Sequence, residues 1–523
     1  MDTNIKTLIA LMGIIVGVLV SEKSVYCSEV AGISFLLGVL QISIYFFERR
    51  KILKSLTQNE EKINNEVTRF SIPLASGIFF IAIFLIVFRM QFSVEKEHLV
   101  CEKSCSFNAV ITNTPTIKNE YQLFSVRPET EGVVYDVQIK APLYPRFQVG
   151  EKLELVGKVS LPYIAMPHAG KKTFDYEMYL RTRGIGSEMV YPKVVVLTGS
   201  GAGYSFKIKL QQLRETFVRN ISLYVSEPAA SLASGMLFGV TSMSEELTQT
   251  FRTAGISHII VLSGFNIVIL ISFVLLVLVF LPLFVRVLCA GVFVIFFVLM
   301  VGGEASIVRA TIMSFIGLVA LLIGRAYVAR QALIVSLIMI IVYEPIHLFH
   351  DVSLHLSFLA TAGIVYMSEG IKSTLHKIRF KTYQEIIATT VSAYLATLPY
   401  VMYTFGTVSL YALLANFIVL PVVPVMMLLT FFVVLISPFA HTPTLVVGYV
   451  DTLLGNVIIF VAHMIERLPL ASLTVSVSFT SMCVGYCILI GGYIFFTQRH
   501  VRKVKNETLL TKQNEILSEV ISY

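Results

Sequence analysis

Charged residues are scarce in this sequence of 523 residues, and their scarcity excludes an ordinary soluble domain. Only 14% of the residues are charged and 55% are hydrophobic, whereas about a quarter of the residues in soluble domains are charged. Tryptophan is absent, so an aromatic belt at a membrane surface must be built mainly from tyrosine. This composition predicts a polytopic membrane protein.

Cysteines are also few, and no two form a C-x-x-C pair of the metal-binding type. Cys101 and Cys105 are close together in a polar region. If that region lies outside the cytoplasm, a disulfide and two free thiols are both compatible with it.

One segment, EPIHLFHDVSLH, has the spacing of a metal site on a helical turn. It begins after Pro345 in an expected outer loop, where histidines are usually solvated. No second cluster completes a coordination sphere, so we expect neither a metal nor another cofactor. Its candidate ligands are His347, His350, Asp351 and His355.

Apolar runs long enough to cross a bilayer recur along the chain. Three open it, at about 7–20, 30–47 and 71–92, and the first is interpreted as a retained helix because only Lys6 precedes it. Nine more follow, near 256–280, 283–302, 307–324, 330–343, 353–368, 384–404, 408–436, 444–464 and 479–497. The expected fold class is mainly α, a polytopic transmembrane helical bundle with about 12 crossings. Pro421 and Pro424 interrupt the run 408–436, which predicts a discontinuous helix or two re-entrant halves.

A different pattern fills the stretch between the third and fourth runs. Segments such as VVYDVQIKA and KLELVGKVSL alternate polar and apolar residues between Gly and Pro turns, which is typical of half-buried strands. We therefore expect a small extracytoplasmic β domain and the following organisation: 1–92 N-terminal transmembrane helices, 93–205 β domain, 206–255 amphipathic interfacial segment, 256–498 transmembrane domain and 499–523 tail.

Basic residues mark one side of the membrane. The loop 48–70, the loops near 325–330 and 372–381, and the tail after 498 are rich in Lys and Arg. The positive-inside rule places them, and both termini, in the cytoplasm, with 93–205 outside.

Four polar blocks interrupt the apolar runs: FRTAGISHIIVLSGFNIVIL, GGEASIVRATIM, SLHLSFLATAGI and LPYVMYTFGTVSLYALLANFIVLPVVP. Polar and ionisable groups in lipid are costly unless they face a partner or a water-filled path. A structural role is the alternative for each: Arg309 pairing with Glu304, or interhelical hydrogen bonding and close packing by the others. The candidate channel-lining or channel-shaping residues are His258, Ser263, Gly264, Asn266, Arg309, His355 and Asn416.

These four blocks, in this order, resemble the membrane competence domain of the ComEC family. The segment KTFDYEMYLRTRGI resembles the end of that family's extracellular OB-like domain, so the resemblance covers roughly residues 70–435. It implies a bacterial inner-membrane channel that passes single-stranded DNA into the cytoplasm during natural transformation. It also implies a separate DNA receptor and a cytoplasmic motor as partners.

Two departures from the family pattern change the expectation. Asn266 stands where the family commonly has His, and an amide cannot take a proton near neutral pH. The sequence also has no H-x-H-x-D-H cluster of the metallo-β-lactamase-like domain that ends the longer family members. We therefore expect no enzymatic activity here and a nuclease that is either another protein or absent.

The β domain carries nearly equal numbers of basic and acidic residues, so its composition predicts no electrostatic funnel for DNA. OB-folds bind single strands through a basic groove with stacking aromatic residues. A structural cap is the other interpretation of this domain. The residues expected to contact single-stranded DNA are Arg127, Lys140, Arg146, Lys152, Tyr135 and Tyr144.

Two other functions fit the same features. Broken helices with intramembrane polar residues also describe a secondary transporter of a small anionic or lipid-linked solute. A membrane enzyme using His258 or His355 is the third possibility, but no carboxylate lies beside either histidine in a recognisable catalytic spacing.

Overall fold

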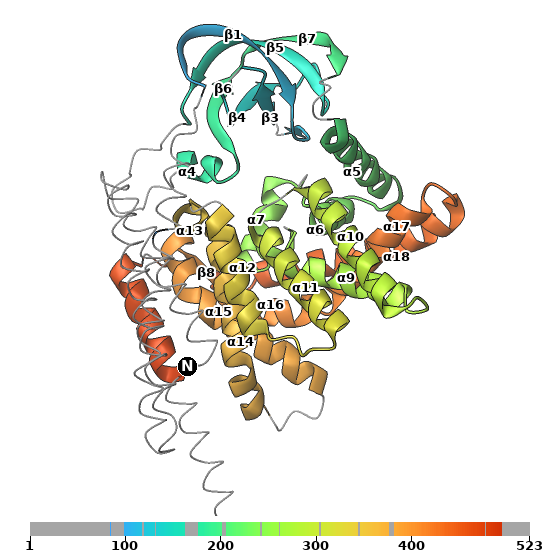
Figure 1. The fold of residues 1–523 in the computed structure, drawn as a ribbon. Helices are drawn as coiled ribbons and strands as arrows, with labels where there is room; N and C mark the ends of the chain where they lie inside the picture. Colours follow the sequence, from blue (N-terminus) through green and yellow to red (C-terminus); the bar gives the residue numbers. More distant parts are fainter. Residues whose placement is uncertain are drawn as a thin grey trace, which may run out of the picture. The chain divides into compact units, whose positions relative to one another are not determined.

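The computed structural model describes Phe84 and residues 99–117, 120–130, 132–162, 176–200, 205–240, 243–260, 262–302, 305–343, 346–375, 381–475 and 477–493. Figure 1 shows the helices and strands in order along the chain. The described residues divide into two units: the first lies within Met1–Ser244, His258–His355 and Pro424–Asn456, and the second lies within Glu245–Ser257, Leu356–Val423 and Val457–Tyr523. The three apolar runs expected before residue 93 and the tail after 498 lie outside the described residues, apart from Phe84.

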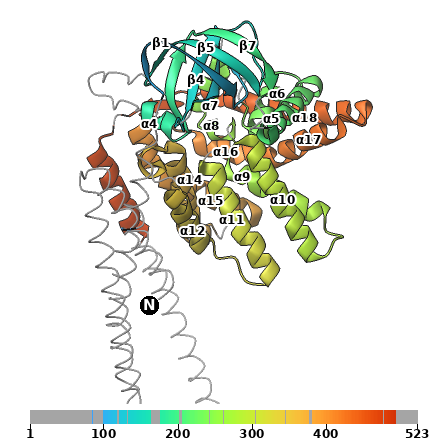
Figure 2. The same cartoon turned by 45° about the horizontal axis from the view of Figure 1, so that its top comes forward.

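A closed five-stranded β barrel belongs to the first unit (Figure 2). Its ring runs β1–β3–β4–β6–β5 and returns to β1, with β4 and β6 parallel and the other neighbours antiparallel. Short β2 pairs with β3, and β7 pairs with β5. The strands are β1 Cys101–Ile111, β2 Thr116–Ile117, β3 Tyr121–Pro128, β4 Asp136–Pro142, β5 Glu151–Ser160, β6 Ile185–Val190 and β7 Lys193–Ser200.

Alternating side chains fill the inside of this barrel, as the period-two pattern predicts. On β5, Leu153 and Leu155 are fully buried, whereas Lys152 and Glu154 between and beside them are half-buried. The ring of Phe124 lies 5.4 Å from that of Phe147, between centroids, inside the same core. The helix α4, Tyr176–Arg181, precedes β6.

Of the two states compatible with Cys101 and Cys105, the structure has free thiols. Both lie on β1, opposite β5, and the Cys105 thiol donates a hydrogen bond to the carbonyl of Gly157 at 3.6 Å. The disulfide alternative is therefore wrong for this structure.

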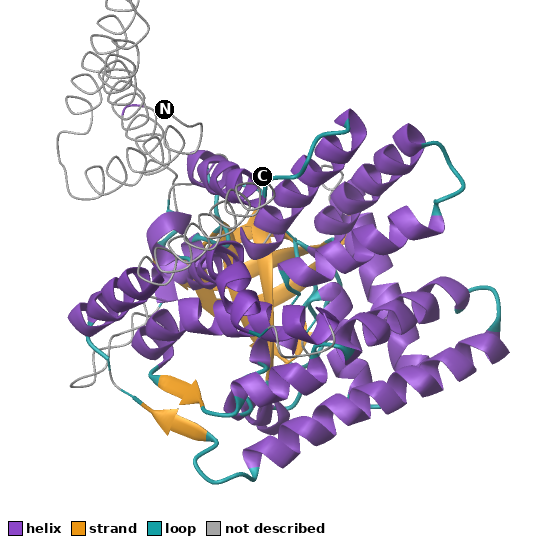
Figure 3. Ribbon diagram, turned by 90° about the horizontal axis from the view of Figure 1, so that it is seen from below, coloured by secondary structure: helices purple, strands orange, loops and turns teal. Residues whose placement is uncertain are grey.

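Helices make up most of the rest of the described chain (Figure 3). The first unit contains α5 Ser205–Tyr224, α6 Ala229–Phe238, α9 Gly264–Val277, α10 Leu283–Val301, α11 Ala305–Ile323, α12 Ala329–Tyr343 and α13 His347–His350, nearly all of α8 Ser257–Ile260 and α17 Val422–Ile436, and the larger part of α18 His441–Glu466.

Polar side chains of α5 donate hydrogen bonds to backbone carbonyl groups at the C-terminal ends of two apolar helices. Gln211 donates through Nε2 to the carbonyl of Met300 at 3.0 Å, near the end of α10. Arg214 donates through Nη2 to the carbonyl of Phe238 at 2.6 Å, at the end of α6. Since the last carbonyls of a helix have no partner within it, these contacts explain why an amphipathic helix stands here.

The second unit holds α7 Glu245–Thr253, most of α14 Val352–Thr374, α15 Lys381–Phe405, α16 Ala412–Val419, a helix Phe479–Tyr493, and the strands β8 Thr407–Ser409 and β9 Ser472–Thr474, which pair antiparallel. A Cβ on Gly363 of α14 would lie 2.5 Å from the Cβ of Ala396 and 2.5 Å from the carbonyl oxygen of Ser392. α14 and α15 therefore pack with their backbones in close approach, as small residues allow.

Five described helices are long and apolar enough to cross a membrane, namely Leu283–Val301, Ser306–Ile323, Val352–Thr374, Lys381–Phe405 and His441–Glu466. The bent pair α16 and α17 makes a sixth if it is one span. A mostly helical membrane protein with a small β domain is thus confirmed. The count of about 12 crossings is not, because α9, α12 and Phe479–Tyr493 are shorter than the roughly 20 residues that a bilayer core requires.

Two of the expected crossings are interrupted. The run 408–436 breaks after Val419, and α17 begins only at Val422, so the discontinuity expected at Pro421 is confirmed. The run 256–280, expected as one crossing, is instead split into α8 and α9, with Ser263 in an extended conformation between them. Helix α9 can begin at Gly264 because the preceding backbone has left the helical region.

Candidate channel-lining site

The break between α8 and α9 is fixed by hydrogen bonds to α6. Ser263 donates through Oγ to Oδ1 of Asn266 at 3.0 Å, and Asn266 donates through Nδ2 to the carbonyl of Met236 at 2.8 Å. Asn266 is only 3% exposed. The Asn266 amide therefore forms a hydrogen bond between α9 and α6, as the alternative of interhelical hydrogen bonding predicted.

Gly235 of α6 allows the end of α8 to lie against α6. A Cβ on Gly235 would lie 2.6 Å from the carbonyl oxygen of Ile260, the last residue of α8. The sequence analysis did not single out Gly235, although its place between Ser234 and Met236 in a helix of small residues is the pattern of close helix packing. His258 lies on α8, and its side chain is exposed.

Arg309 of α11 packs its guanidinium against the first residue of α9. A Cβ on Gly264 would lie 2.7 Å from Nη2 of Arg309 and 3.0 Å from the Cβ of Ala310, so only glycine permits this approach. Arg309 is 7% exposed, which confirms that it points into the protein and not outward. Glu304, the structural partner expected for it, lies outside the described residues.

The electrostatic environment at the N-terminus of α9, beside the Arg309 guanidinium, favours an anion. The first N–H groups of a helix and its macrodipole give the N-terminus a partial positive charge. Ser263, at the N-cap of α9, makes no side-chain capping hydrogen bond. A buried guanidinium beside this helix end adds positive charge of the same sign, and together they match a phosphate or carboxylate.

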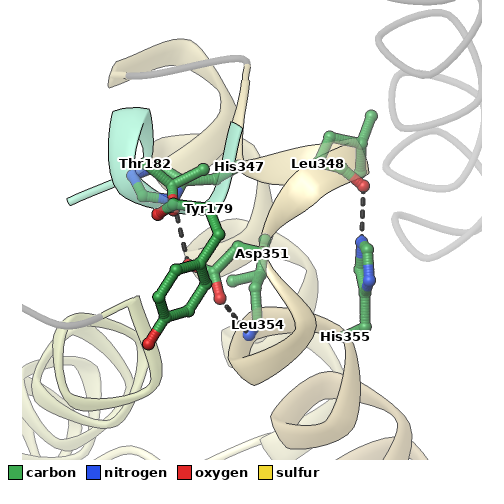
Figure 4. Close-up of polar contacts among 7 residues, drawn as sticks. All are labelled: Tyr179, Thr182, His347, Leu348, Asp351, Leu354 and His355. Carbon is green, nitrogen blue, oxygen red and sulfur yellow. Dashed lines mark hydrogen bonds and ion pairs between the residues drawn. The ribbon is translucent and has the colours of Figure 1, made fainter. Parts of the chain in front are cut away.

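His355 and its neighbours make hydrogen bonds with one another within residues 347–355 (Figure 4). His355 Nε2 lies 2.6 Å from the carbonyl oxygen of Leu348, and His347 Nδ1 lies 3.0 Å from Oδ2 of Asp351. Asp351 also accepts a hydrogen bond from the backbone N–H of Leu354 at 3.0 Å and so caps α14. Within the described residues, no group of three or more potential metal ligands occurs.

Asn416 is on α16, in the second unit. It lies on the buried face of its helix, at 7% exposed. Gly255, with a φ of +74°, packs beside Ala412 of the same face, where its missing Cβ makes room for the helix. Asn416 Oδ1 has no hydrogen-bond partner among the described residues.

The residues expected to contact DNA on the barrel do not form one free face. Arg127 forms an ion pair with Asp136, and Lys152 pairs with Glu129 at 2.6 Å. Tyr135 is only 8% exposed. These three side chains are engaged within the barrel, and a contact of theirs with DNA stays a prediction.

Lys140, Tyr144 and Arg146 remain on the barrel surface. The Arg146 guanidinium lies 5.9 Å from the ring centre of Tyr144, which is 73% exposed. Lys140 on β4 holds its Nζ 4.1 Å from the ring centre of Tyr121 on β3 and 5.8 Å from that of Tyr191. Cation–π pairs of this kind keep an aromatic face and a positive charge together at the surface.

Residues that the sequence analysis missed extend this surface. The Arg183 guanidinium lies 4.5 Å from the ring centre of Tyr179, and the rings of Tyr179 and Tyr176 stack at 6.2 Å. Burial raises the pKa of Tyr176, and nearby Glu188 raises it further. We call the following set the tyrosine patch: Tyr121, Lys140, Tyr176, Tyr179, Arg183 and Tyr191.

Comparison with known proteins assigns the helical region to a protein family. The family model described as "Competence protein" matches residues 236–500, just over half of the chain. This chain belongs to the competence protein family. It is also 23% identical over 339 residues to "ComE operon protein 3" of Bacillus subtilis (strain 168), a match that covers 60% of this chain and 40% of that relative. No solved structure matches.

The competence match contains every candidate residue of the helical region and excludes the barrel. Its start, at residue 236, falls on the α6 turn that receives Asn266. The helices α9 and α11 and the last three residues of α6 therefore fall within the competence match. The barrel residues lie outside the match, and their role rests on geometry alone.

Proposed function

We propose that this competence protein forms an inner-membrane channel that passes single-stranded DNA into the cytoplasm during natural transformation. Membership of the competence family and the membrane-length helices support a role in DNA uptake. The observation that carries the proposal is the buried guanidinium of Arg309 at the N-terminus of α9.

DNA is a polyanion, so its path through lipid must lower the cost of transferring phosphates. Arg309 and the first N–H groups of α9 supply positive charge where bulk water is excluded, and such charge acts more strongly than at the surface. Asn266 and Ser263 do not meet the strand in this proposal; they hold α9 so that its N-terminus stays beside Arg309.

The barrel receives the strand before it enters the bundle. In an OB-fold, the second and third strands of the ring form the oligonucleotide-binding face. The corresponding strands here are β3 and β4, which carry Tyr121 and Lys140. The tyrosine patch, in which Tyr191 is exposed and the other three tyrosines are half-buried, is the proposed contact for single-stranded DNA, since bases stack on aromatic rings.

The remaining parts of the proposal concern location and partners. Both termini are placed in the cytoplasm and the barrel outside, on the positive-inside rule. A separate DNA receptor, a nuclease and a cytoplasmic motor are proposed as partners, and the channel itself performs no catalysis.

Replacing Arg309 tests the central step. We expect Arg309→Gln to lower the uptake of labelled DNA by more than about tenfold at unchanged amounts of membrane-inserted protein, because one guanidinium–phosphate contact is lost at low dielectric. Arg309→Lys keeps the charge but not the planar fork and should retain part of the activity. Arg325→Gln removes the same charge from the exposed loop after α11 and serves as the matched control.

The outcomes separate the roles of Arg309. Loss of protein from the membrane with Arg309→Gln would mean a structural cation, and normal uptake at normal abundance would remove Arg309 from the path. A secondary transporter is the second candidate, favoured by the broken helices α8–α9 and α16–α17. Normal transformation in a strain lacking the gene would support that candidate.

A further inference from the structure

Asp451 is an acidic residue in the middle of α18, and its side chain is buried. Its side chain is 0% exposed, and α18 is one of the helices long and apolar enough to cross a membrane. It belongs to none of the four polar blocks of the sequence. An acidic residue at such a position is costly and is most often functional.

The face of α18 that carries Asp451 packs closely against neighbouring helices. A Cβ on Gly455 would lie 2.5 Å from the Cβ of Ala229 on α6 and 3.0 Å from Cε of Met426 on α17. Gly448 approaches the backbone carbonyl of Tyr224 so closely that no Cβ fits there. Gly448, Asp451 and Gly455 are spaced three and four residues apart and so share one helix face. Asp451 therefore points at neighbouring helices.

The hydrogen bonds around Thr430 require one more proton than an ionised Asp451 provides. Thr430 Oγ1 lies 2.8 Å from Oδ2 of Asp451 and 2.9 Å from the carbonyl oxygen of Met426. A hydroxyl has one proton, so Thr430 can donate to only one of these acceptors. If Asp451 is protonated, Oδ2–H donates to Thr430 Oγ1 and Thr430 donates to Met426, so that both contacts are hydrogen bonds.

The second carboxyl oxygen leads to the same conclusion. Oδ1 of Asp451 has no hydrogen-bond partner among the described residues. On an ionised carboxylate this oxygen would carry negative charge that is both buried and unpaired, which is strongly unfavourable. On a carboxylic acid it is a neutral carbonyl oxygen, for which the missing partner costs far less.

No described positive charge compensates Asp451. The helices α6 and α17, which pack against this face, contain no titratable residue, and neither does α9, whose Phe273 packs against Phe431 of α17. The other titratable groups nearby are engaged elsewhere or exposed. Glu227, on the α5–α6 connection, accepts a hydrogen bond from Ser231. The hydroxyl of Tyr224, the last residue of α5, lies 2.9 Å from Nδ1 of His441 of α18. Also on α18, Tyr449 is 65% exposed and His463 pairs with Glu466.

We propose that Asp451 and Thr430 form a proton-binding site inside the helix bundle, and that this site holds its proton at neutral pH. The ligand is a single proton, held between Oδ2 of Asp451 and Oγ1 of Thr430. Its release leaves a charge that the packed interface cannot solvate, so deprotonation requires water or a cation to enter between α6, α17 and α18. The site does not depend on whether DNA passes near Arg309.

Infrared spectroscopy of the full-length protein in lipid membranes tests the proposal. A protonated carboxylic acid has a C=O band that carboxylates and amides lack. At pH 7 we expect this band in the spectrum of the wild type minus that of Asp451→Asn, and we expect it to shift in heavy water. Asp451→Asn has the shape of the neutral acid and should keep the protein in the membrane.

A second variant assigns the band without altering the carboxyl group. Thr430→Val removes the hydrogen-bond acceptor and should shift the band without abolishing it. Thr444→Val is the matched control, because Thr444 is a fully buried threonine of α18 that bonds the carbonyl of Ala440, and it should leave the band unchanged. A wild-type spectrum whose band neither disappears with Asp451→Asn nor shifts with Thr430→Val would overturn the proposal. A band that appears only when sodium is removed would overturn it in favour of a bound cation.

Discussion

Gly264→Ala is the smallest change that moves Arg309 away from the end of α9. The added Cβ would lie 2.7 Å from Nη2 of Arg309, whereas non-bonded heavy atoms normally lie about 3.5–4 Å apart. The guanidinium must therefore retreat by about 1 Å. Since Nη2 is the tip of a flexible side chain, the retreat costs on the order of 1 kcal/mol. The Cβ would also lie 3.0 Å from the Cβ of Ala310, a few tenths of an ångström too close, so we expect the free energy of unfolding to fall modestly, by on the order of 1 kcal/mol.

The effect on transport follows from Coulomb's law. At an effective dielectric constant of about 20, a unit charge pair gains about 4.2 kcal/mol at 4 Å and about 3.3 kcal/mol at 5 Å. The difference of about 0.8 kcal/mol corresponds to a roughly fourfold weaker interaction with a phosphate. The assay is uptake of labelled DNA per molecule of membrane-inserted protein, and we expect it to fall by about that factor.

Gly363→Ala is the contrasting control. There the new Cβ would meet the backbone carbonyl oxygen of Ser392 and the Cβ of Ala396, each at 2.5 Å, and neither can swing away. Overpacking of this kind costs about 1–3 kcal/mol, so the amount of protein should fall while uptake per molecule changes little. Unchanged uptake per molecule by Gly264→Ala would refute the proposed role of Arg309. Depletion of Gly264→Ala as severe as that of Gly363→Ala would show that the junction is rigid.

Three further outcomes are expected. Lys140→Ala should weaken single-stranded DNA binding by the full-length protein several-fold, since a stacked cation is lost, whereas Lys152→Ala, at an ion pair, should change it little; equal losses would argue against the tyrosine patch. Burial raises the pKa of the Cys105 thiol to about 11, so alkylation of Cys105 at pH 8 should be about 100-fold slower in the folded protein than after unfolding, and equal rates would contradict this. Cysteines introduced at positions 60 and 150 should react with a membrane-impermeant reagent only at 150 in intact cells, and the reverse result would invert the proposed orientation.

The sequence was sufficient for the features that depend on local pattern. Period-two alternation predicted the strands of the barrel, and long apolar runs predicted the membrane helices, because both periodicities are set by backbone geometry and burial on one face. The break at Pro421 followed from the missing N–H of proline. The order of the four polar blocks was enough to identify the competence family.

Contacts between residues distant in the sequence were decided only by the tertiary structure. Nothing near Arg127, Lys152 or Tyr135 in the sequence revealed that two of them form ion pairs and the third is buried, since their partners come from other strands or loops. Likewise, the amide of Asn266 and the missing Cβ of Gly235 acquire their roles only when α6 lies against α9 and α8.

The sequence by itself therefore determined the class of this protein, and the tertiary structure decided which polar residues belong together. Arg309 was conspicuous in the sequence because a charge in an apolar run is costly wherever it points. Asp451 is equally costly, yet only the packing of α6, α17 and α18 shows that it is fully buried with Thr430 as its neighbour. Hydrophobic periodicity records how much of each helix is buried, whereas the partner of a buried polar group is set by packing between helices, which no local pattern encodes.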